Sequence, residues 1–206
     1  MHSGLPLILA STSPYRKELL GRLGLPFEVV PPGYDERPAP GLSPRDLALH
    51  HALGKARSVA RTSPERIVVG SDQVAELGGR ILGKPGTRQR AVGQLLEASG
   101  RTVRFHTGLA LVRGSREEAW VESFSVRFRR LTRQQVEAYV GADRPFGSAG
   151  AFRVESLGIA LMEAMEGRDY TALIGLPLIA LVELLGRFGV DVLLERLRWE
   201  PPSPVA

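Results

Sequence analysis

Two polar segments each follow a short apolar run and carry side chains that could bind phosphate or a cation. The first is residues 11–16, Ser-Thr-Ser-Pro-Tyr-Arg. Ser13 followed by Pro14 predicts the start of a helix, whose free backbone N–H groups suit a phosphate. Ser11 and Ser13 add hydroxyl groups, and Arg16 adds a planar guanidinium for phosphate oxygens. Taken alone, the segment is also typical of an ordinary capped helix with a surface arginine.

The second segment is residues 70–74, Gly-Ser-Asp-Gln-Val, which follows the apolar run Ile67–Val69. A carboxylate at the end of a strand lies where α/β sheets place their functional sites. Asp72 is therefore predicted to deprotonate a water molecule or to bind a divalent cation such as Mg²⁺ or Mn²⁺. A turn aspartate that accepts a backbone hydrogen bond is the open alternative.

Two lysines stand out because the chain otherwise uses arginine for nearly every positive charge. Of its 27 basic residues only Lys17, Lys55 and Lys84 are lysines. A compact ammonium suits a point contact to phosphate, so Lys55 and Lys84 are predicted to bind phosphate. Pro85 also restricts Lys84 to extended backbone. Lys17, on a charged helix face, is interpreted as an ordinary surface residue.

Two further carboxylates are candidates for the same chemistry. Glu36 follows Asp35 in the loop Pro31–Gly41, and a charged loop pair of this kind is usually only solvated. Glu155 follows an apolar stretch, where an unpartnered charge would be costly to bury. The histidines, in contrast, fit structural roles.

Composition excludes several other chemistries. The chain has 206 residues and no cysteine, so thiol nucleophiles, disulfides and cysteine-ligated metals are excluded. The four histidines lack a zinc-binding spacing, so any metal should be a hard cation held by oxygen atoms. The formal net charge of +5 favours a polyanionic ligand. Because the arginines are dispersed, a nucleotide is expected rather than a nucleic acid polymer.

No targeting or membrane segment is expected. The start of the chain lacks the charged region of a signal peptide, and no apolar run has the roughly 18–20 residues that a membrane span needs. The mean hydropathy of −0.04 is that of a globular domain. A cytoplasmic protein without a membrane partner is therefore expected.

The elements that must position these residues alternate along the first half of the chain. Strands are predicted at Leu5–Ala10, Phe27–Val30, Ile67–Val69, Val103–Val112, Trp120–Phe128, Ala149–Glu155 and Gly158–Glu163. Helices are predicted from Pro14 to Gly24, from Pro44 to about Arg61, from Thr87 to Ala98, and over Thr132–Val140 and Leu176–Phe188. Early alternation followed by long antiparallel strands predicts an α/β fold with a mixed sheet. A single domain over residues 1–206 is expected, with a frayed tail over 201–206.

The order of these motifs resembles the Maf family from about Leu7 to Leu185. The resemblance rests on residues 9–20 (Leu-Ala-Ser-Thr-Ser-Pro-Tyr-Arg-Lys-Glu-Leu-Leu), the Gly-Ser-Asp-Gln-Val segment, residues 81–85 (Ile-Leu-Gly-Lys-Pro) and residues 149–155 (Ala-Gly-Ala-Phe-Arg-Val-Glu). It implies a two-lobed fold around a long, twisted mixed sheet flanked by helices, similar to Ham1 proteins, and a homodimer. It also implies a divalent-cation-dependent pyrophosphatase that cuts a nucleoside triphosphate to the monophosphate and pyrophosphate.

The resemblance also implies roles for individual residues. Asp72 would be the catalytic base or a metal ligand, with Glu36 assisting metal binding. The triphosphate would be neutralised by Arg16, Lys55 and Lys84.

Three residues resemble the 7-methyl-GTP pyrophosphatase branch of that family. They are Tyr15, Gln73 and Glu155, and the departure is Tyr15, where that branch has Trp. Methylation at N7 makes guanine cationic, so an aromatic face at Tyr15 would attract it by about 0.5–2 kcal/mol. Glu155 could accept from the base and offset its charge, and Gln73 could donate to the base carbonyl.

Two alternatives stay open at this point. Within the same reaction class, the substrate could be dTTP, UTP or a broader set of non-canonical nucleotides. In a different class, the chain could be a nucleotide-binding regulator of septum formation without turnover. The presence of Asp72 with Lys55 and Lys84 counts against that second class, because a sensor would not need a base.

Overall fold

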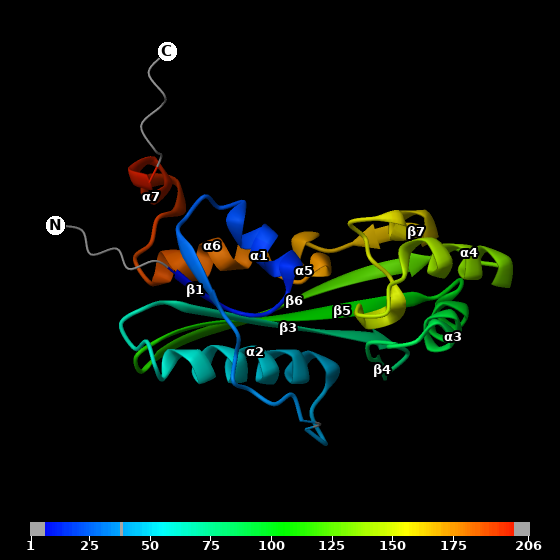
Figure 1. Cartoon of the computed structure of the whole chain (residues 1–206), viewed down its shortest axis with the longest axis horizontal. Helices are drawn as coiled ribbons and strands as arrows, with labels where there is room; N and C mark the ends of the chain where they lie inside the picture. Colours follow the sequence, from blue (N-terminus) through cyan, green and yellow to red (C-terminus); the bar gives the residue numbers. More distant parts are fainter. Residues whose placement is uncertain (1–6, 38, 200–206) are drawn as a thin grey trace, which may run out of the picture.

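The computed structural model describes residues 7–37 and 39–199. Within them a long sheet crosses the molecule, with helix α2 (Pro44–Ala60) on one face and helices α1 (Pro14–Gly21) and α6 (Leu178–Arg187) on the other (Figure 1). Helices α3 (Arg88–Ala98) and α4 (Arg133–Asp143) cover the far end of the long strands. The predicted frayed tail lies outside the described residues.

The sheet is mixed, which confirms the predicted α/β class. Its strands are β1 (Leu7–Ala10), β2 (Phe27–Val30), β3 (Val68–Leu77), β4 (Arg80–Leu82), β5 (Thr102–Arg113), β6 (Arg116–Phe128) and β7 (Met162–Glu166). The order is β2-β1-β3-β5-β6-β7, with β4 paired to β3. Strand β1 runs parallel to β2 and β3, and the other pairs are antiparallel. The expected hairpin of two long strands is β5–β6, which turns at Gly114 with a φ of 59°.

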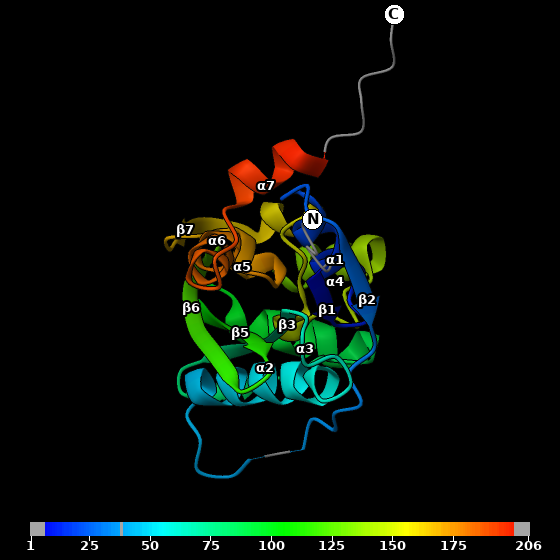
Figure 2. The same cartoon turned by 90° about the vertical axis from the view of Figure 1, so that its left-hand side faces the viewer.

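The sequence predicted the helix starts correctly because a polar capping residue precedes a proline or an apolar run. The side chains of Ser13, Ser43 and Thr87 each accept a hydrogen bond from the backbone N–H three residues later, at the starts of α1, α2 and α3. Two short helices, α5 (Thr171–Ile174) and α7 (Val192–Trp199), complete the C-terminal part. The view from the side shows α2 beneath the sheet and α7 beyond α6 (Figure 2).

Buried apolar side chains form separate clusters at the two ends of the long strands. One cluster joins the sheet to α1 and α6 and includes Leu9, Leu20 and Leu181. Another lies under α3 and α4 and includes Phe105 and Phe128. A third cluster, with Ile8 and Val68, lies between the sheet and α2.

Two predicted strands were wrong. Short 3₁₀ helices form at η1 (Ala149–Ala151) and η2 (Leu157–Leu161), and β7 begins only at Met162. The reason is local backbone: Gly150 and Ala151 have positive φ angles of 72° and 59°, which an extended strand cannot contain. The 149–161 segment is therefore an irregular wall rather than part of the sheet.

Asp72 also differs from its predicted place at a strand end. Strand β3 continues to Leu77, and Asp72 pairs with Gly108 of β5 in the middle of the ladder. The polar residues at 71–73 do not end the strand because β5 and β6 extend the sheet beside them. Asp72 is thus held by strand backbone rather than by a turn.

Helix α2 lies unusually close to the sheet because glycines face it. A Cβ on Gly70 or Gly108 would overlap the backbone carbonyl of Ala52 or Ala48 in α2. We expect Gly108→Ala to lower the free energy of unfolding by about 1–3 kcal/mol, as overpacking does. Urea denaturation measures it, with Gly141→Ala as the control. Gly141 lies within α4 with open space around its Cβ position, so alanine there should stabilise by about 0.5–1 kcal/mol. Equal effects of the two substitutions would contradict the close-packing argument.

Candidate active site

All ten residues predicted from the sequence to form the site line one cavity of about 510 Å³. They come from four parts of the fold: the start of α1, the loop after β2, the α2–β3 pair, and the loops after β4 and η1. They are Ser11, Ser13, Tyr15, Arg16, Glu36, Lys55, Asp72, Gln73, Lys84 and Glu155. The fold therefore brings together what the sequence separates by up to about 140 positions.

The start of α1 supplies two hydroxyl groups to the cavity. Ser11 Oγ accepts the backbone N–H of Ser13 (3.1 Å), and Ser13 Oγ accepts that of Arg16 (3.4 Å). Each hydroxyl acts here as an acceptor, so its own hydrogen stays available for an anionic ligand. The capped-helix interpretation and the phosphate-binding interpretation are therefore compatible.

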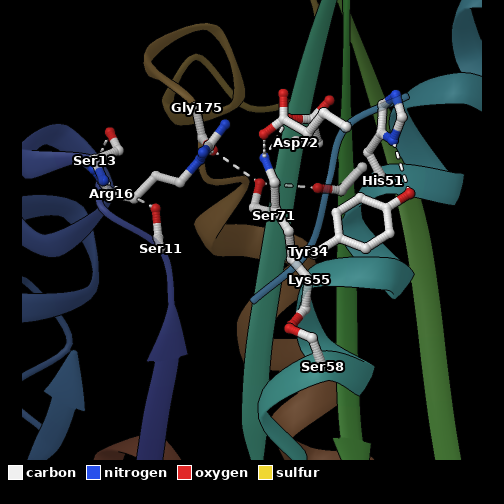
Figure 3. A network of polar contacts seen from close by, with 12 residues as sticks. Ser11, Ser13, Arg16, Tyr34, His51, Lys55, Ser58, Ser71, Asp72 and Gly175 are labelled. Carbon is white, nitrogen blue, oxygen red and sulfur yellow. Dashed lines mark hydrogen bonds and ion pairs between the residues drawn. The ribbon is translucent and has the colours of Figure 1, made fainter. Parts of the chain in front are cut away.

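Arg16 is aimed by the backbone of a distant turn. Its Nε donates to the carbonyl oxygen of Gly175 (2.8 Å), which also accepts from Ser71 Oγ (2.9 Å) (Figure 3). Gly175 has a φ of 131°, a conformation that favours glycine, where it ends α5. Burial lowers the pKa of Arg16, and the negative charges of Asp72 and Glu36 raise it in partial compensation. Within the described residues Arg16 forms no ion pair with a carboxylate, so its Nη atoms can donate hydrogen bonds to phosphate oxygens.

Lys55 is the centre of the charged part of the cavity. Its Nζ lies 2.6 Å from Asp72 Oδ1 and 2.7 Å from Glu36 Oε1. The lysine is 6% exposed and Asp72 is 8% exposed, so this contact between α2 and β3 is shielded from water. Loss of hydration raises the pKa of Glu36, but hydrogen bonding and attraction to Lys55 lower it more, so the net shift is downward. Lys55 is thus held by two carboxylates, a role that its predicted phosphate contact did not include.

Both carboxylates keep an oxygen for another ligand. Asp72 Oδ2 has no hydrogen-bond partner among the described residues, because Lys55 contacts only Oδ1. Glu36 likewise uses Oε1 for Lys55 and is half exposed. In the part of the chain that the structure describes, no group of three or more His, Cys, Asp or Glu side chains could hold a metal. The protein therefore offers two carboxylates to a cation.

Lys84 lies at the rim of the cavity, in the loop between β4 and α3. It is exposed, and the adjacent Pro85 is buried and anchors the loop. Among the described residues no carboxylate forms an ion pair with Lys84, although its charge helps to lower the pKa of Glu36. An exposed, unpaired ammonium at the rim can meet an entering anion.

Gln73 does not have the free donor that the sequence predicted. Its Nε2 donates to Thr107 Oγ1 (3.1 Å) and to the carbonyl oxygens of Ala172 (2.8 Å) and Leu173 (3.0 Å). Backbone carbonyls only accept, so the amide orientation is set by its neighbours. The Oε1 atom has no partner among the described residues. Gln73 therefore offers the cavity an acceptor.

Tyr15 and Glu155 also line the cavity. Tyr15 is half-buried, and its hydroxyl accepts a hydrogen bond from Arg153 Nη1 (3.1 Å). Glu155 is exposed, which corrects the prediction that it lies beside an apolar strand. Burial by its neighbours still raises the pKa of Glu155, although its own backbone N–H and the charge of Arg153 lower it.

Several residues that shape the cavity were missed by sequence reasoning. Ser71 fixes the Gly175 carbonyl, and the Tyr34 hydroxyl bonds to His51 Nδ1 (3.0 Å) above Lys55 (Figure 3). Arg153 reaches Tyr15 from the irregular segment after η1. For Ser71 and Arg153 the nearest signal was their position inside the motifs at 70–74 and 149–155. Nothing in the spacing indicated the partners, because each contact joins distant parts of the chain.

The structure defines a mixed α/β protein in which an aspartate of β3, a lysine of α2 and an arginine of α1 converge on a polar cavity. The model of the Maf-like protein family matches residues 6–188, and the chain belongs to this family. That membership confirms the resemblance read from the motifs.

Curated relatives share about half of their residues with this chain. A Nitrosococcus oceani protein named 7-methyl-GTP pyrophosphatase is 54% identical, over 91% of this chain and 95% of that protein. Proteins of the same name from Bordetella pertussis and Syntrophotalea carbinolica are 51% and 47% identical, each over 91% of this chain and over 94% and 96% of their own lengths.

A solved structure, the Staphylococcus aureus Ham1 protein, has a TM-score of 0.43 at 15% identity, over 60% of this chain and 72% of that chain. The family membership rests on the sequence matches. Within the described residues, no helix combines the length and apolar character needed to cross a membrane.

Proposed function

We propose that this protein is a nucleoside triphosphate pyrophosphatase that prefers 7-methyl-GTP and releases pyrophosphate and 7-methyl-GMP. The names of the curated relatives support this activity, since they cover nearly the whole chain at about 50% identity. The supporting observation in the structure is the Glu36–Lys55–Asp72 cluster, in which Lys55 and Asp72 are shielded from water. This cluster lies in one cavity with Arg16 and Lys84. Such a cavity combines carboxylates for a cation with cations for a polyphosphate.

The donor set fits a divalent cation that is shared with the substrate. Glu36 and Asp72 each have an oxygen within hydrogen-bonding distance of the same Lys55 ammonium, so the two carboxylates are close together. Mg²⁺ is commonly bound by one or two carboxylates plus substrate phosphates and water, and this cavity supplies that number. Glu36 and Asp72 would hold Mg²⁺ or Mn²⁺. When bound, the cation would polarise the phosphate oxygens and offset their charge.

Each charged residue then has a role in the reaction, and Asp72 has two, since it would hold the cation and also act as the base. Asp72 Oδ2 takes a proton from a water molecule, whose oxygen forms a bond to the α-phosphorus. The bond between the α-phosphorus and the bridging oxygen breaks, and its electron pair stays on that oxygen, which leaves as part of pyrophosphate. Arg16 and Lys84 offset the charge that develops on the phosphate oxygens, because preorganised cations stabilise such a transition state. Lys55 keeps Asp72 in place through Oδ1, so that Oδ2 faces the water.

Base recognition is assigned to other residues that line the cavity. The Tyr15 ring would stack on the base, and a cationic ring system attracts an aromatic face. Glu155 would accept hydrogen bonds from the N1–H and the exocyclic amine of guanine. Gln73 would contribute Oε1 as an acceptor, since its amide N–H groups are already bonded.

Product analysis tests the reaction class. We expect equimolar pyrophosphate and nucleoside monophosphate, with activity that is lost in EDTA and restored by Mg²⁺ or Mn²⁺. Ion chromatography of the products and a metal titration measure both. Release of single orthophosphate, or full activity in EDTA, would contradict the proposal.

The alternatives predict different substrate panels. A dTTP or UTP pyrophosphatase would hydrolyse those pyrimidine nucleotides faster than 7-methyl-GTP. A regulator of septum formation would bind nucleotide without turnover, and such a site would not need the unbonded Asp72 Oδ2 beside Lys55. Our proposal also includes a cytoplasmic location and a homodimer, which sedimentation would test, and a single domain over residues 1–206.

A further inference from the structure

An ion pair outside the proposed catalytic cluster, with a buried carboxylate and a partly exposed guanidinium, is connected to the proposed base-binding residue Tyr15. Asp143, the last residue of α4, is 8% exposed, and its Oδ1 accepts from Arg153 Nη2 (2.7 Å). Ser156 Oγ contacts both of its carboxylate oxygens (2.8 Å each), and Tyr139 also bonds to it. Although burial raises the pKa of Asp143, the hydrogen bonds from Arg153, Tyr139 and Ser156 lower it more. The carboxylate is therefore charged and fully partnered.

This ion pair leaves Arg153 little freedom. Besides Asp143 Oδ1, the same Nη2 contacts the Asp143 backbone oxygen, and the Arg153 backbone N–H donates to the Tyr139 hydroxyl (3.0 Å). Rotation of the guanidinium would leave the buried Asp143 carboxylate without its charge partner, which is costly. The guanidinium is thus fixed from the α4 side.

The other terminal nitrogen of the guanidinium, Nη1, bonds to a residue that lines the cavity. Arg153 Nη1 donates to the Tyr15 hydroxyl (3.1 Å), a contact that spans 138 residues and joins the 149–161 segment to α1. A tyrosine side chain has only two rotatable torsions, so one bond at its hydroxyl orients the whole ring. The charge of Arg153 also favours the ionised form of Glu155, two residues further on.

We propose that Arg153 is a positioning residue for base recognition: held by Asp143, it orients the Tyr15 ring and supports the charge of Glu155. This inference rests on the proposed function for its substrate, a nucleotide with a cationic purine base. Arg153 acts through Tyr15 and touches neither the phosphates nor the proposed cation.

Two conservative variants remove the Arg153–Tyr15 contact from opposite sides. Tyr15→Phe keeps the ring and every Asp143 interaction but lacks the acceptor. Arg153→Lys keeps a positive charge beside Asp143 but lacks the planar fork that reaches both partners. The matched control is Tyr170→Phe, which removes a hydrogen bond of the same kind and length, from Arg22 Nη1 (3.1 Å), at an exposed place outside the cavity. Thermal unfolding of each variant reports whether the fold persists.

Equilibrium binding gives the decisive readout without requiring turnover. Calorimetric titration with 7-methyl-GMP and with UMP measures the ratio of the two affinities. We expect Tyr15→Phe and Arg153→Lys each to lower that ratio about 3–10-fold, the effect of one hydrogen bond. The double variant should lower the affinity ratio no further than either single variant, because both substitutions remove the same contact. Tyr170→Phe should match the wild type.

Kinetics distinguishes positioning from a general structural role. In the hydrolysis of 7-methyl-GTP, Tyr15→Phe should raise KM and leave kcat within about twofold, since it disturbs only binding of the base. An unchanged affinity ratio in both variants, additive losses in the double variant, or an equal loss for both nucleotides would overturn the proposal. A wild type that hydrolyses no nucleotide would contradict the proposed function, and a lowered affinity ratio in both variants of that protein would still support the positioning role.

Discussion

Asp72→Asn should retain the fold and lose about 10²–10⁴-fold in kcat, the usual cost of removing a general base. An amide at Oδ2 cannot take the proton from water, and it also binds a divalent cation poorly. The fold should persist because Lys55 keeps its second carboxylate partner, Glu36, at 2.7 Å. Pyrophosphate release under saturating substrate and metal measures the loss, and circular dichroism measures the fold.

The control for this substitution is Asp35→Asn. Asp35 lies in the loop that carries Glu36, is exposed, and pairs with Arg37 rather than with a residue of the cavity. It should retain nearly full activity, which would show that the loss at Asp72 is not a general effect of removing a negative charge. A turnover above a tenth of the wild-type value in Asp72→Asn would instead favour a structural aspartate.

Glu155→Gln should reduce kcat/KM for 7-methyl-GTP about 10–150-fold while affecting dTTP and UTP much less. The substitution keeps the size of the side chain but removes the charge that faces a cationic base, and a charge-assisted hydrogen bond is worth about 1.5–3 kcal/mol. The wild type should also prefer 7-methyl-GTP over GTP, because these substrates differ by one methyl group and one positive charge. Initial rates across the four nucleotides measure both effects.

The pH dependence of substrate selectivity provides an independent test of the role of Glu155. Because burial raises the pKa of this carboxyl, its negative charge should disappear at a higher pH than that of an ordinary glutamate as the solution is acidified. As the pH is lowered, the selectivity for 7-methyl-GTP over dTTP should therefore decrease in the wild type and stay constant in Glu155→Gln. The matched control is Glu163→Gln, an exposed glutamate paired with Arg127, which should behave as wild type. A uniform loss for all nucleotides in Glu155→Gln would indicate a structural or metal-binding carboxylate.

Local signals were sufficient for most of the secondary structure. Ser13 before Pro14 and Ser43 before Pro44 predicted two helix starts correctly, since a cap is a contact between residues three apart. The alternating runs on either side of Gly114 predicted the long hairpin. Prediction failed in the 149–161 segment, where positive φ angles at Gly150 and Ala151 override an apolar pattern that otherwise favours strands.

The sequence by itself determined which chemical groups the cavity contains, because residue types and the order of the motifs are local information. Only the tertiary structure decided what each group contacts. Lys55 proved to bridge two carboxylates, and the Gln73 amide proved to be bonded to the chain at 172–173. The hydrogen bond from Arg153 to Tyr15 joins positions 138 residues apart. Side-chain partners of this kind depend on which strands pair and how closely α2 approaches the sheet, and burial then makes each unpaired charge or donor costly enough to select one arrangement.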